Sequence, residues 1–250
     1  MPTANTEGDG YSPLDDPVVT VIMPCHNHAH FLPVAVESAI TQSYKNKRLV
    51  IINDGSTDSS LEVAESLANE HEIITVLNNP EPTGPSAARN KGIKHAWDET
   101  DFFCMLDADD SYLPGKIEES VKKILPDPDR IGLVYGDVVI YNHATKTSNL
   151  ELREPYNRER IEQECMISNT PLISKFALSK AGLYDESMRT AEDWDLWLRI
   201  TEQFVAVHAP NAMSIYSVTG NNASDTVDKE IWNENWDKIR KRIMSQHDIS

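Results

Sequence analysis

The chain has 250 residues, of which 40% are hydrophobic and 25% are charged, so it contains enough apolar material for a sizeable core. Its 23 basic and 40 acidic residues give a formal net charge of −17, which argues against nucleic acid and against an anionic membrane surface as partners. The apolar runs are too short to cross a membrane, and the three scattered cysteines predict reduced thiols, so we expect a cytoplasmic protein without an integral membrane segment. Peripheral contact with the inner face of the membrane, through the basic patch at 238–242, is the alternative.

Short apolar segments and helical segments alternate along the first half of the chain. After a stretch at 1–16 that we expect to be a mobile tail, strands are predicted at 18–23, 48–52, 73–77 and 102–106. Helices are predicted at 32–42, 59–70, 86–97 and 115–125, with Ser59 and Ser86 as N-caps. Repeated strand–helix–strand units predict an α/β fold with a mostly parallel central sheet, helices on both faces and ligands at the carboxyl ends of the strands.

The second half of the chain has a looser pattern. Strands at 131–135 and 138–141 precede a charged segment at 153–164, and helices are expected at 174–181, 192–203 and within 226–250. Trp232 and Trp236 lie one turn apart in the C-terminal helix, which predicts that they anchor it to the domain or to a second subunit. A homodimer is therefore one expectation.

The strand at 102–106 ends in three closely spaced carboxylates, Asp107, Asp109 and Asp110. Carboxylates this crowded repel each other unless a cation lies among them. Oxygen ligands at the end of a buried strand suit a hard divalent ion, which usually shares its coordination shell with water and substrate phosphates. The sequence therefore predicts a Mg²⁺ or Mn²⁺ site here.

Five segments together resemble a known family. They are VTVIMPCHN at 19–27, IINDGSTD at 51–58, GPSAARNKG at 84–92, MLDADD at 105–110 and EDWDLWLR at 192–199. In this order and at these separations they resemble the inverting family 2 glycosyltransferases with the GT-A fold, a Rossmann-like fold of enzymes that transfer a sugar from a nucleotide diphosphate donor. The resemblance covers about residues 18–224 and implies one GT-A domain at 17–225, with a nucleotide-binding half at 17–141 and an acceptor-side half at 142–225.

The resemblance also implies roles for individual residues on the donor side. The base and ribose pocket would be lined by Pro24, Cys25, His26 and Asn27, with Asn53 and Asp54 at the base and Arg89 near the donor. Asp107 would meet the ribose beside Ala108, Asp109 would hold the metal, and Asp110 would support the loop. A carboxylate can accept a hydrogen bond from the imide N–H of uracil, which cytosine lacks, so Asp54 favours a UDP-sugar.

The catalytic base is expected in the first turn of the helix at 192–203, with Thr190 as its cap. In the family the second residue of the Glu-Asp pair usually acts as base, which favours Asp193 over Glu192. Helical spacing places Asp193 on the buried face with Trp197, whereas Asp195 is expected on a solvent-exposed stripe as an ion-pair partner of Arg199.

Two positions depart from the family pattern. His26 stands where many relatives have a tyrosine that stacks on the base, and Thr219 stands where a histidine can complete the metal or diphosphate shell. The second departure bears on metal affinity. Cys25, His26, His28 and His30 could instead suggest zinc, but structural zinc sites usually space their ligands in pairs on separate elements.

The resemblance implies a hexosyltransferase of polysaccharide or glycoconjugate biosynthesis. Its partners would be a nucleotide-sugar donor and a hydroxyl acceptor on a glycan, a lipid-linked saccharide or a protein. The alternatives are a catalytically silent nucleotide-sugar binding module and a metal-dependent nucleotidyltransferase. The latter would require a Gly-rich, basic phosphate loop after the first strand, where this chain has histidines and asparagine.

Overall fold

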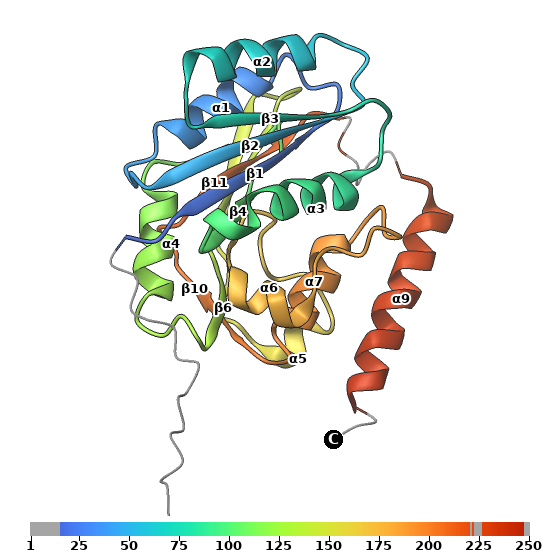
Figure 1. The fold of residues 1–250 in the computed structure, drawn as a ribbon. Helices are drawn as coiled ribbons and strands as arrows, with labels where there is room; N and C mark the ends of the chain where they lie inside the picture. Colours follow the sequence, from blue (N-terminus) through green and yellow to red (C-terminus); the bar gives the residue numbers. More distant parts are fainter. Residues whose placement is uncertain (1–15, 221, 223–226, 248–250) are drawn as a thin grey trace, which may run out of the picture.

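The computed structural model describes residues 16–220, 222 and 227–247, so nearly all of the expected N-terminal tail lies outside the described residues. The chain forms the α/β structure that the sequence predicts, with a central sheet between layers of helices (Figure 1). In the part of the chain that the structure describes, no helix is long and apolar enough to cross a membrane.

The central sheet has seven strands in the order β10-β6-β9-β4-β1-β2-β3. Its strands are β1 Val19–Cys25, β2 Lys47–Asp54, β3 Ile74–Asn79, β4 Phe102–Met105, β6 Ile131–Tyr135, β9 Leu172–Ser174 and β10 Val205–His208. Strand β1 runs parallel to both β2 and β4, which brings the carboxyl ends of all three to one edge of the sheet. Strand β9 is antiparallel to β4 and β6 and was not predicted, because a strand of three residues, of which two are apolar, is too short to show strand periodicity.

Helices cover both faces of this sheet. They are α1 Leu32–Ile40, α2 Ser60–Glu70, α3 Pro85–Ala96, α4 Lys116–Ile124, α5 Arg158–Ile161, α6 Lys175–Ala181, α7 Glu192–Ile200 and α9 Lys229–His247, with a 3₁₀ turn at Trp97–Glu99. In Figure 1, α1 and α2 lie on one side of β1 to β3 and α3 lies on the other.

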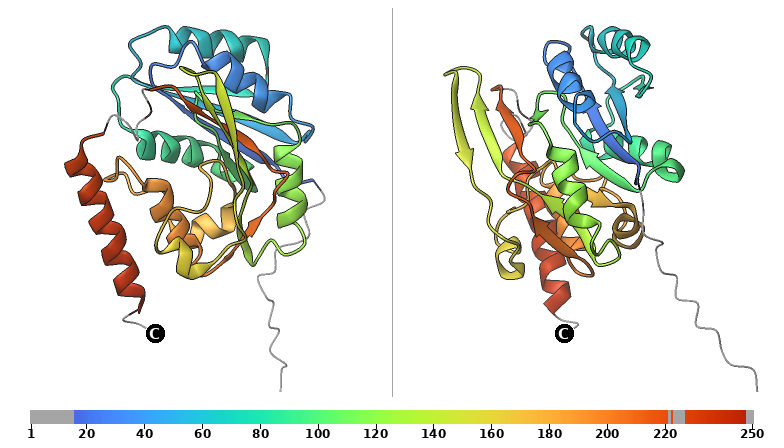
Figure 2. Two further views of the ribbon diagram at one scale, coloured as in Figure 1. Left: turned by 180° about the vertical axis from the view of Figure 1, so that it is seen from behind. Right: turned by 90° about the vertical axis from the view of Figure 1, so that its left-hand side faces the viewer.

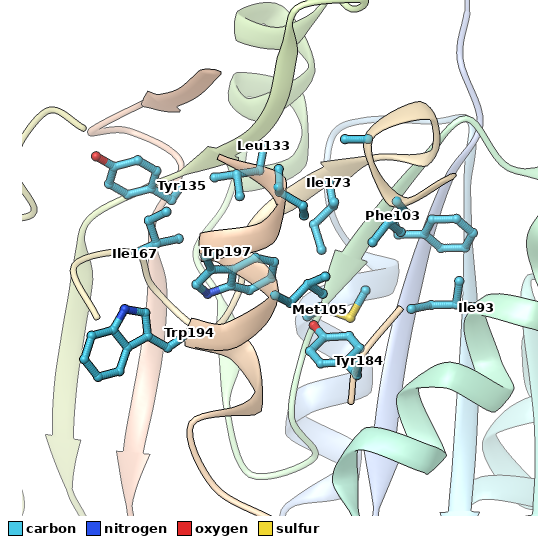
Figure 3. Close-up of a cluster of buried hydrophobic side chains, with 14 of the residues drawn as sticks. Ile93, Phe103, Met105, Leu133, Tyr135, Ile167, Ile173, Tyr184, Trp194 and Trp197 are labelled. Carbon is cyan, nitrogen blue, oxygen red and sulfur yellow. The ribbon is translucent and has the colours of Figure 1, made fainter. Parts of the chain in front are cut away.

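Successive strand side chains point to opposite faces and build two cores. On β4, Phe103 and Met105 pack with Ile93 of α3 and with Trp197 of α7, as Figure 3 shows. Phe102 and its alternate neighbour Cys104 pack instead with buried residues of α1 and α4. Both faces of β4 are therefore buried, which holds the loop that follows it.

A second sheet of four strands lies beside the first, in the order β5-β11-β7-β8. Its strands are β5 Ser111–Tyr112, β11 Ser214–Val218, β7 Val138–Asn142 and β8 Thr147–Glu151. The right-hand view of Figure 2 shows the β7–β8 hairpin along one side of the molecule. Strand β8 was not predicted, since its residues are mostly exposed and polar.

Of the two predicted serine caps, Ser59 does stand at the N-cap position of α2, whereas Ser86 lies inside α3 and is not its cap. Ser59 makes no capping hydrogen bond, and Asp58 instead accepts one from the Ser60 N–H at 2.9 Å. Helix α3 begins at Pro85 after Gly84, whose φ of 93° is accessible to glycine without strain. The Ser86 hydroxyl donates to the backbone oxygen of Met188 at 3.0 Å.

Thr190 does not cap α7 either. Its hydroxyl oxygen accepts a hydrogen bond from Asn235 of α9 at 2.8 Å, a contact that no local pattern could predict. The N-cap of α7 is Ala191, with a left-handed backbone at φ 56°. Asp193 accepts a hydrogen bond from the Trp194 N–H at 2.7 Å, so a carboxylate of the first turn takes the role expected of the cap.

Candidate active site

A cavity of about 750 Å³ opens at the carboxyl ends of β1, β2 and β4. One wall consists of the loops after these strands, and the other consists of the start of α7 and the inner face of α9. All the predicted site residues line this cavity except Asn27 and Asn53. The volume lies within the range of roughly 300–1,000 Å³ that is usual for ligand pockets.

Asn27 and Asn53 hold the loops in place instead of lining the cavity. Asn27 has a left-handed backbone at φ 56°, and its side-chain oxygen accepts from the Thr57 N–H at 2.7 Å. Asn53 is buried and donates to the side chain of Asn78 on β3 at 2.8 Å. Because neighbouring strand residues face opposite ways, Asn53 points away when Asp54 points into the cavity.

Asp54 ends β2 at the base of the cavity. Its carboxylate accepts hydrogen bonds from the Asn79 side chain at 2.7 Å, from Thr83 and from the Gly84 N–H at 2.9 Å. Burial alone would raise the pKa of this carboxyl, but the hydrogen bonds from Asn79 and Thr83 outweigh it and hold the pKa below its usual value. Asp54 is therefore a fixed, ionised acceptor at neutral pH.

Gly55 is required immediately after Asp54. Its φ is 62°, and a Cβ at this position would lie 2.4 Å from the backbone nitrogen of Pro82. The chain can turn this tightly against the 81–82 segment only without a side chain. This close approach places Thr83 and Gly84 within hydrogen-bonding distance of Asp54.

His26 lies at the exposed edge of the same loop. Its Nδ1 is 2.7 Å from the backbone oxygen of Asp54, and its Nε2 is 3.1 Å from the side-chain nitrogen of Asn27. Both ring nitrogens thus have protein partners, which fixes the plane of the imidazole beside the cavity. A ring held in this way can present a face to a ligand.

Arg89 of α3 connects the two walls of the cavity. Its guanidinium donates to Asp107 and to Glu192, each at 2.6 Å, and lies 5.4 Å from the centre of the Tyr184 ring. Burial opposes the charge of Arg89, but Asp107 and then Glu192 raise its pKa well above the usual value. Glu192 is therefore committed to an ion pair.

Within the described residues, Asp193 forms no ion pair of this kind, although the charge of Arg89 acts on it from a distance. Its pKa is raised to about 7, chiefly because it is buried and then because Glu192 carries a like charge, while the Trp194 N–H opposes the shift. A carboxyl with a pKa near neutrality can exchange a proton with a bound hydroxyl. Of the two acidic residues at the start of α7, only Asp193 is free to do so.

The predicted position of Asp195 is wrong. Asp195 is fully buried and bridges Arg199, at 2.9 Å, and Arg242 of α9. The ion pair with Arg199 is confirmed. The face of α7 that helical spacing predicted to be exposed is instead covered by α9. Packing of a distant helix therefore overrides the local amphipathic pattern.

The carboxylates after β4 are held in different ways. Asp110 is buried and accepts hydrogen bonds from the Ser217 N–H and from Asn169, each at 2.8 Å, so it supports the loop as expected. Asp109 faces the cavity, 3.9 Å from Nε2 of His28. Burial, and then the charge of Asp107, raise the pKa of Asp109.

The carboxylates after β4 supply only part of a metal site. In the described ranges, no group of three or more His, Cys, Asp and Glu side chains is arranged to hold a metal ion by itself. Asp109 nevertheless presents a carboxylate that lacks a lysine or arginine partner in the same part of the chain. Such a group fits a divalent cation that takes its remaining ligands from water and a bound diphosphate.

The sequence did not identify several residues of the wall opposite the strand ends. Cys165, Arg189, Trp232 and Trp236 line it, together with Tyr216 of β11. They come from segments without a recognisable motif, and helical spacing alone could not indicate which face of α9 meets the cavity. Trp236 packs against Trp194 within the chain, with ring centres 4.7 Å apart, so the predicted anchoring to the domain is confirmed.

Comparison with known proteins gives consistent results. A family model described as glycosyl transferase family 2 matches residues 20–187. An uncharacterized glycosyltransferase of Rickettsia typhi is 30% identical over 193 residues, which is 73% of this chain and 58% of the relative. The UDP-Glc:alpha-D-GlcNAc-diphosphoundecaprenol beta-1,3-glucosyltransferase WfgD of Escherichia coli is 25% identical over 232 residues, covering 90% of this chain and 87% of WfgD.

Two solved structures share the fold. The mannosyltransferase PcManGT from Pyrobaculum calidifontis, in complex with GDP-Man and Mn²⁺, superposes with a TM-score of 0.65 at 19% identity, over 84% of this chain and 60% of that protein. TarS of S. aureus in complex with UDP superposes with a TM-score of 0.66 at 17% identity, over 81% of this chain and 61% of TarS. The predicted GT-A fold is thereby confirmed.

Proposed function

We propose, since this chain belongs to glycosyl transferase family 2, that it transfers a sugar from a nucleotide diphosphate sugar to a hydroxyl acceptor with inversion at the anomeric carbon. The observation that carries this proposal is that the two acidic residues at the start of α7 have different surroundings. Glu192 is paired with Arg89, whereas Asp193 faces the cavity with a pKa near 7. A single in-line displacement needs one such base on the acceptor side.

The donor nucleotide occupies the wall formed by the ends of β1, β2 and β4. The ionised Asp54 carboxylate, which its hydrogen bonds hold in place, accepts a hydrogen bond from the imide N–H of uracil. UDP is therefore the favoured nucleotide. The TarS structure contains UDP and the PcManGT structure contains GDP-Man, so both nucleotides occur on this fold. His26 presents its ring beside the base, and Asp107, oriented by Arg89, meets the ribose.

Asp109 would hold a divalent cation, Mg²⁺ or Mn²⁺, next to the donor diphosphate. When bound, such a cation stabilises the negative charge that develops on the leaving diphosphate. Asp110 keeps the loop in position through Ser217 and Asn169. Mn²⁺ is present in the PcManGT structure, which supports a divalent metal but leaves its identity to experiment.

Asp193 takes the proton of the acceptor hydroxyl while that oxygen attacks the anomeric carbon. The nucleoside diphosphate leaves from the opposite face, so the configuration of the sugar inverts. The position of Asp193, next to Trp194 and opposite the strand ends, separates the base from the leaving group. Glu192 keeps Arg89 in place and takes no proton.

A donor panel tests this proposal. The protein is incubated with UDP-, GDP- and dTDP-sugars, with and without MnCl₂, and the released phosphate species are separated by chromatography. Free nucleoside diphosphate supports sugar transfer or donor hydrolysis. Release of pyrophosphate would indicate a nucleotidyltransferase instead, and binding of a nucleotide sugar without turnover would indicate a silent binding module.

A further inference from the structure

Helix α9 is joined to the segment that carries the proposed base. Asn235 donates to the backbone oxygen of Thr190 at 3.1 Å and to its hydroxyl oxygen at 2.8 Å, and Lys238 donates to the backbone oxygen of Ser187 at 3.0 Å. Ile239 is fully buried in the core, as expected for a helix packed on the domain. In Figure 1 this helix (red) stands beside α7. These contacts fix the position of the inner face of α9 relative to the start of α7.

That inner face presents two indole rings to the cavity. Trp232 and Trp236 are four residues apart, so they lie on the same face of α9, and both line the cavity. The Trp236 ring packs edge-on against Trp194, which directly follows Asp193. Trp232 is only partly buried, and it lines the cavity. A flat aromatic surface beside a catalytic carboxylate suits the C–H face of a sugar ring.

A cation lies in the same wall. Arg189 is exposed and lines the cavity three residues before Glu192, and within the described residues it makes no ion pair or hydrogen bond. Other arginines near the cavity are engaged: Arg89 with Asp107, and Arg242 with Asp195. In a chain with a net charge of −17, a cavity-lining arginine that pairs with no carboxylate among the described residues is suited to an anionic ligand.

From these observations we infer that the acceptor is a saccharide carrying a phosphate or diphosphate group, bound between α7 and α9. Its sugar ring packs on Trp232 and Trp236, and its phosphate pairs with Arg189. This inference rests on the proposed function and specifies the acceptor, which the donor-side residues leave open. The donor wall contributes Asp54 and Asp109, so the two substrates meet at Asp193 from opposite walls.

Steady-state kinetics on an acceptor panel test this inference. Nucleoside diphosphate release is measured with a fixed donor and increasing concentrations of five probes: N-acetylglucosamine 1-phosphate, glucose 1-phosphate, the methyl glycosides of the same two sugars, and citronellyl diphosphate N-acetylglucosamine. We expect phosphorylated probes to raise release above the rate with water alone, and to do so at lower concentrations than the methyl glycosides. A greater effect of the citronellyl probe identifies a lipid-linked source, and an equal effect identifies the free sugar phosphate.

Variants assign the effect to the named residues. Arg189→Gln should raise the acceptor KM for phosphorylated probes at least tenfold. Its acceptor KM for methyl glycosides should stay within twofold of the wild-type value. Trp232→Ala should raise the acceptor KM for both classes, with partial recovery in Trp232→Phe. Neither change should alter the donor KM by more than twofold. Lys241→Gln, an exposed charge change on the same helix, is the matched control and should match the wild-type enzyme.

Three results would overturn the inference. A parallel rise in donor KM for Arg189→Gln would place this residue at the donor diphosphate. If Arg189→Gln raised the acceptor KM equally for phosphorylated and neutral probes, the acceptor would not be recognised by its phosphate. A donor that is hydrolysed but stimulated by no probe would exclude this acceptor class and leave the proposed function standing, whereas no hydrolysis of any donor would contradict the proposed function itself.

Discussion

The two walls of the cavity differ in how they are built. The donor wall consists of loops that follow neighbouring strands, and its polar side chains bond to one another, as Asp54 does with Asn79 and Thr83. The opposite wall joins residues from α7, β11 and α9, and one of its charged side chains, Arg189, has no partner in the described ranges. The polar side chains of the first wall are therefore held in place before a ligand binds. The surface of the second wall depends instead on α9, which is distant in the sequence.

The largest expected effect concerns the proposed base, Asp193, on the wall opposite the strand ends. Asp193→Asn keeps the size of the side chain and its hydrogen bond from Trp194 but removes the proposed base. General base catalysis is typically worth about 10²–10⁴ in rate, so kcat should fall by that factor while the donor KM stays nearly unchanged. Full transfer activity in this variant would show that the base lies elsewhere.

The connection between the walls can be broken by Arg89→Met. This change leaves the buried Glu192 and the partly buried Asp107 without their cation, and removing one partner of a buried ion pair costs about 3–5 kcal/mol. Urea denaturation should show that loss in the free energy of unfolding. Arg48→Gln, which breaks the exposed pair with Glu99, is the control and should cost roughly 0–1 kcal/mol. Equal effects of the two changes would contradict the role of Arg89.

The donor wall can be weakened separately by Asp109→Ala. Loss of outer-shell partners typically lowers metal affinity about 10–100-fold, so loss of a direct ligand should lower it at least as much. Titration of Mn²⁺ in the presence of UDP, followed by electron paramagnetic resonance, measures this affinity without turnover. The conservative change Asp109→Glu should retain part of it. Unaltered Mn²⁺ binding in Asp109→Ala would assign the metal to other residues.

A smaller effect on stability should accompany the loss of the base. The pKa of Asp193 is raised to about 7 on folding, so the folded state loses stability as the pH rises from about 4, where the unfolded carboxyl ionises, to about 7. Asp193→Asn should therefore be more stable than the wild-type protein at pH 8, by at least about 1 kcal/mol or 2–4 °C in Tm, with a smaller gain at pH 5. Calorimetry at the two pH values measures the difference. A variant that is equally stable or less stable at pH 8 would contradict the raised pKa.

The contrast between the walls also explains what could be predicted from the sequence. The donor wall follows from local patterns, because an apolar strand that ends in polar residues places them at one edge of a parallel sheet. Asp54, Asp107 and Asp109 were found in this way. Even here, alternation along β2 turned Asn53 away from the cavity, since a strand presents only every second residue to one face.

The opposite wall could not be predicted, because long-range packing decides it. Asp195 belongs to a helical stripe that would be exposed if α7 were alone, but α9 covers it and supplies Arg242. Threonine is common at helix N-caps, yet Thr190 accepts a hydrogen bond from Asn235, 45 residues away in the sequence. A pattern within one helix carries no information about which helix will pack against it.

The central claim is that Asp193 is the base at the junction of the two walls. The pH dependence of kcat at saturating donor and metal tests it most directly, because kcat reports the ionisation of groups in the enzyme–substrate complex. Since the base acts in its ionised form, kcat should decrease with falling pH below an apparent pKa near 7. A kcat that stays constant from pH 5 to pH 8 would contradict the assignment of Asp193 as the base.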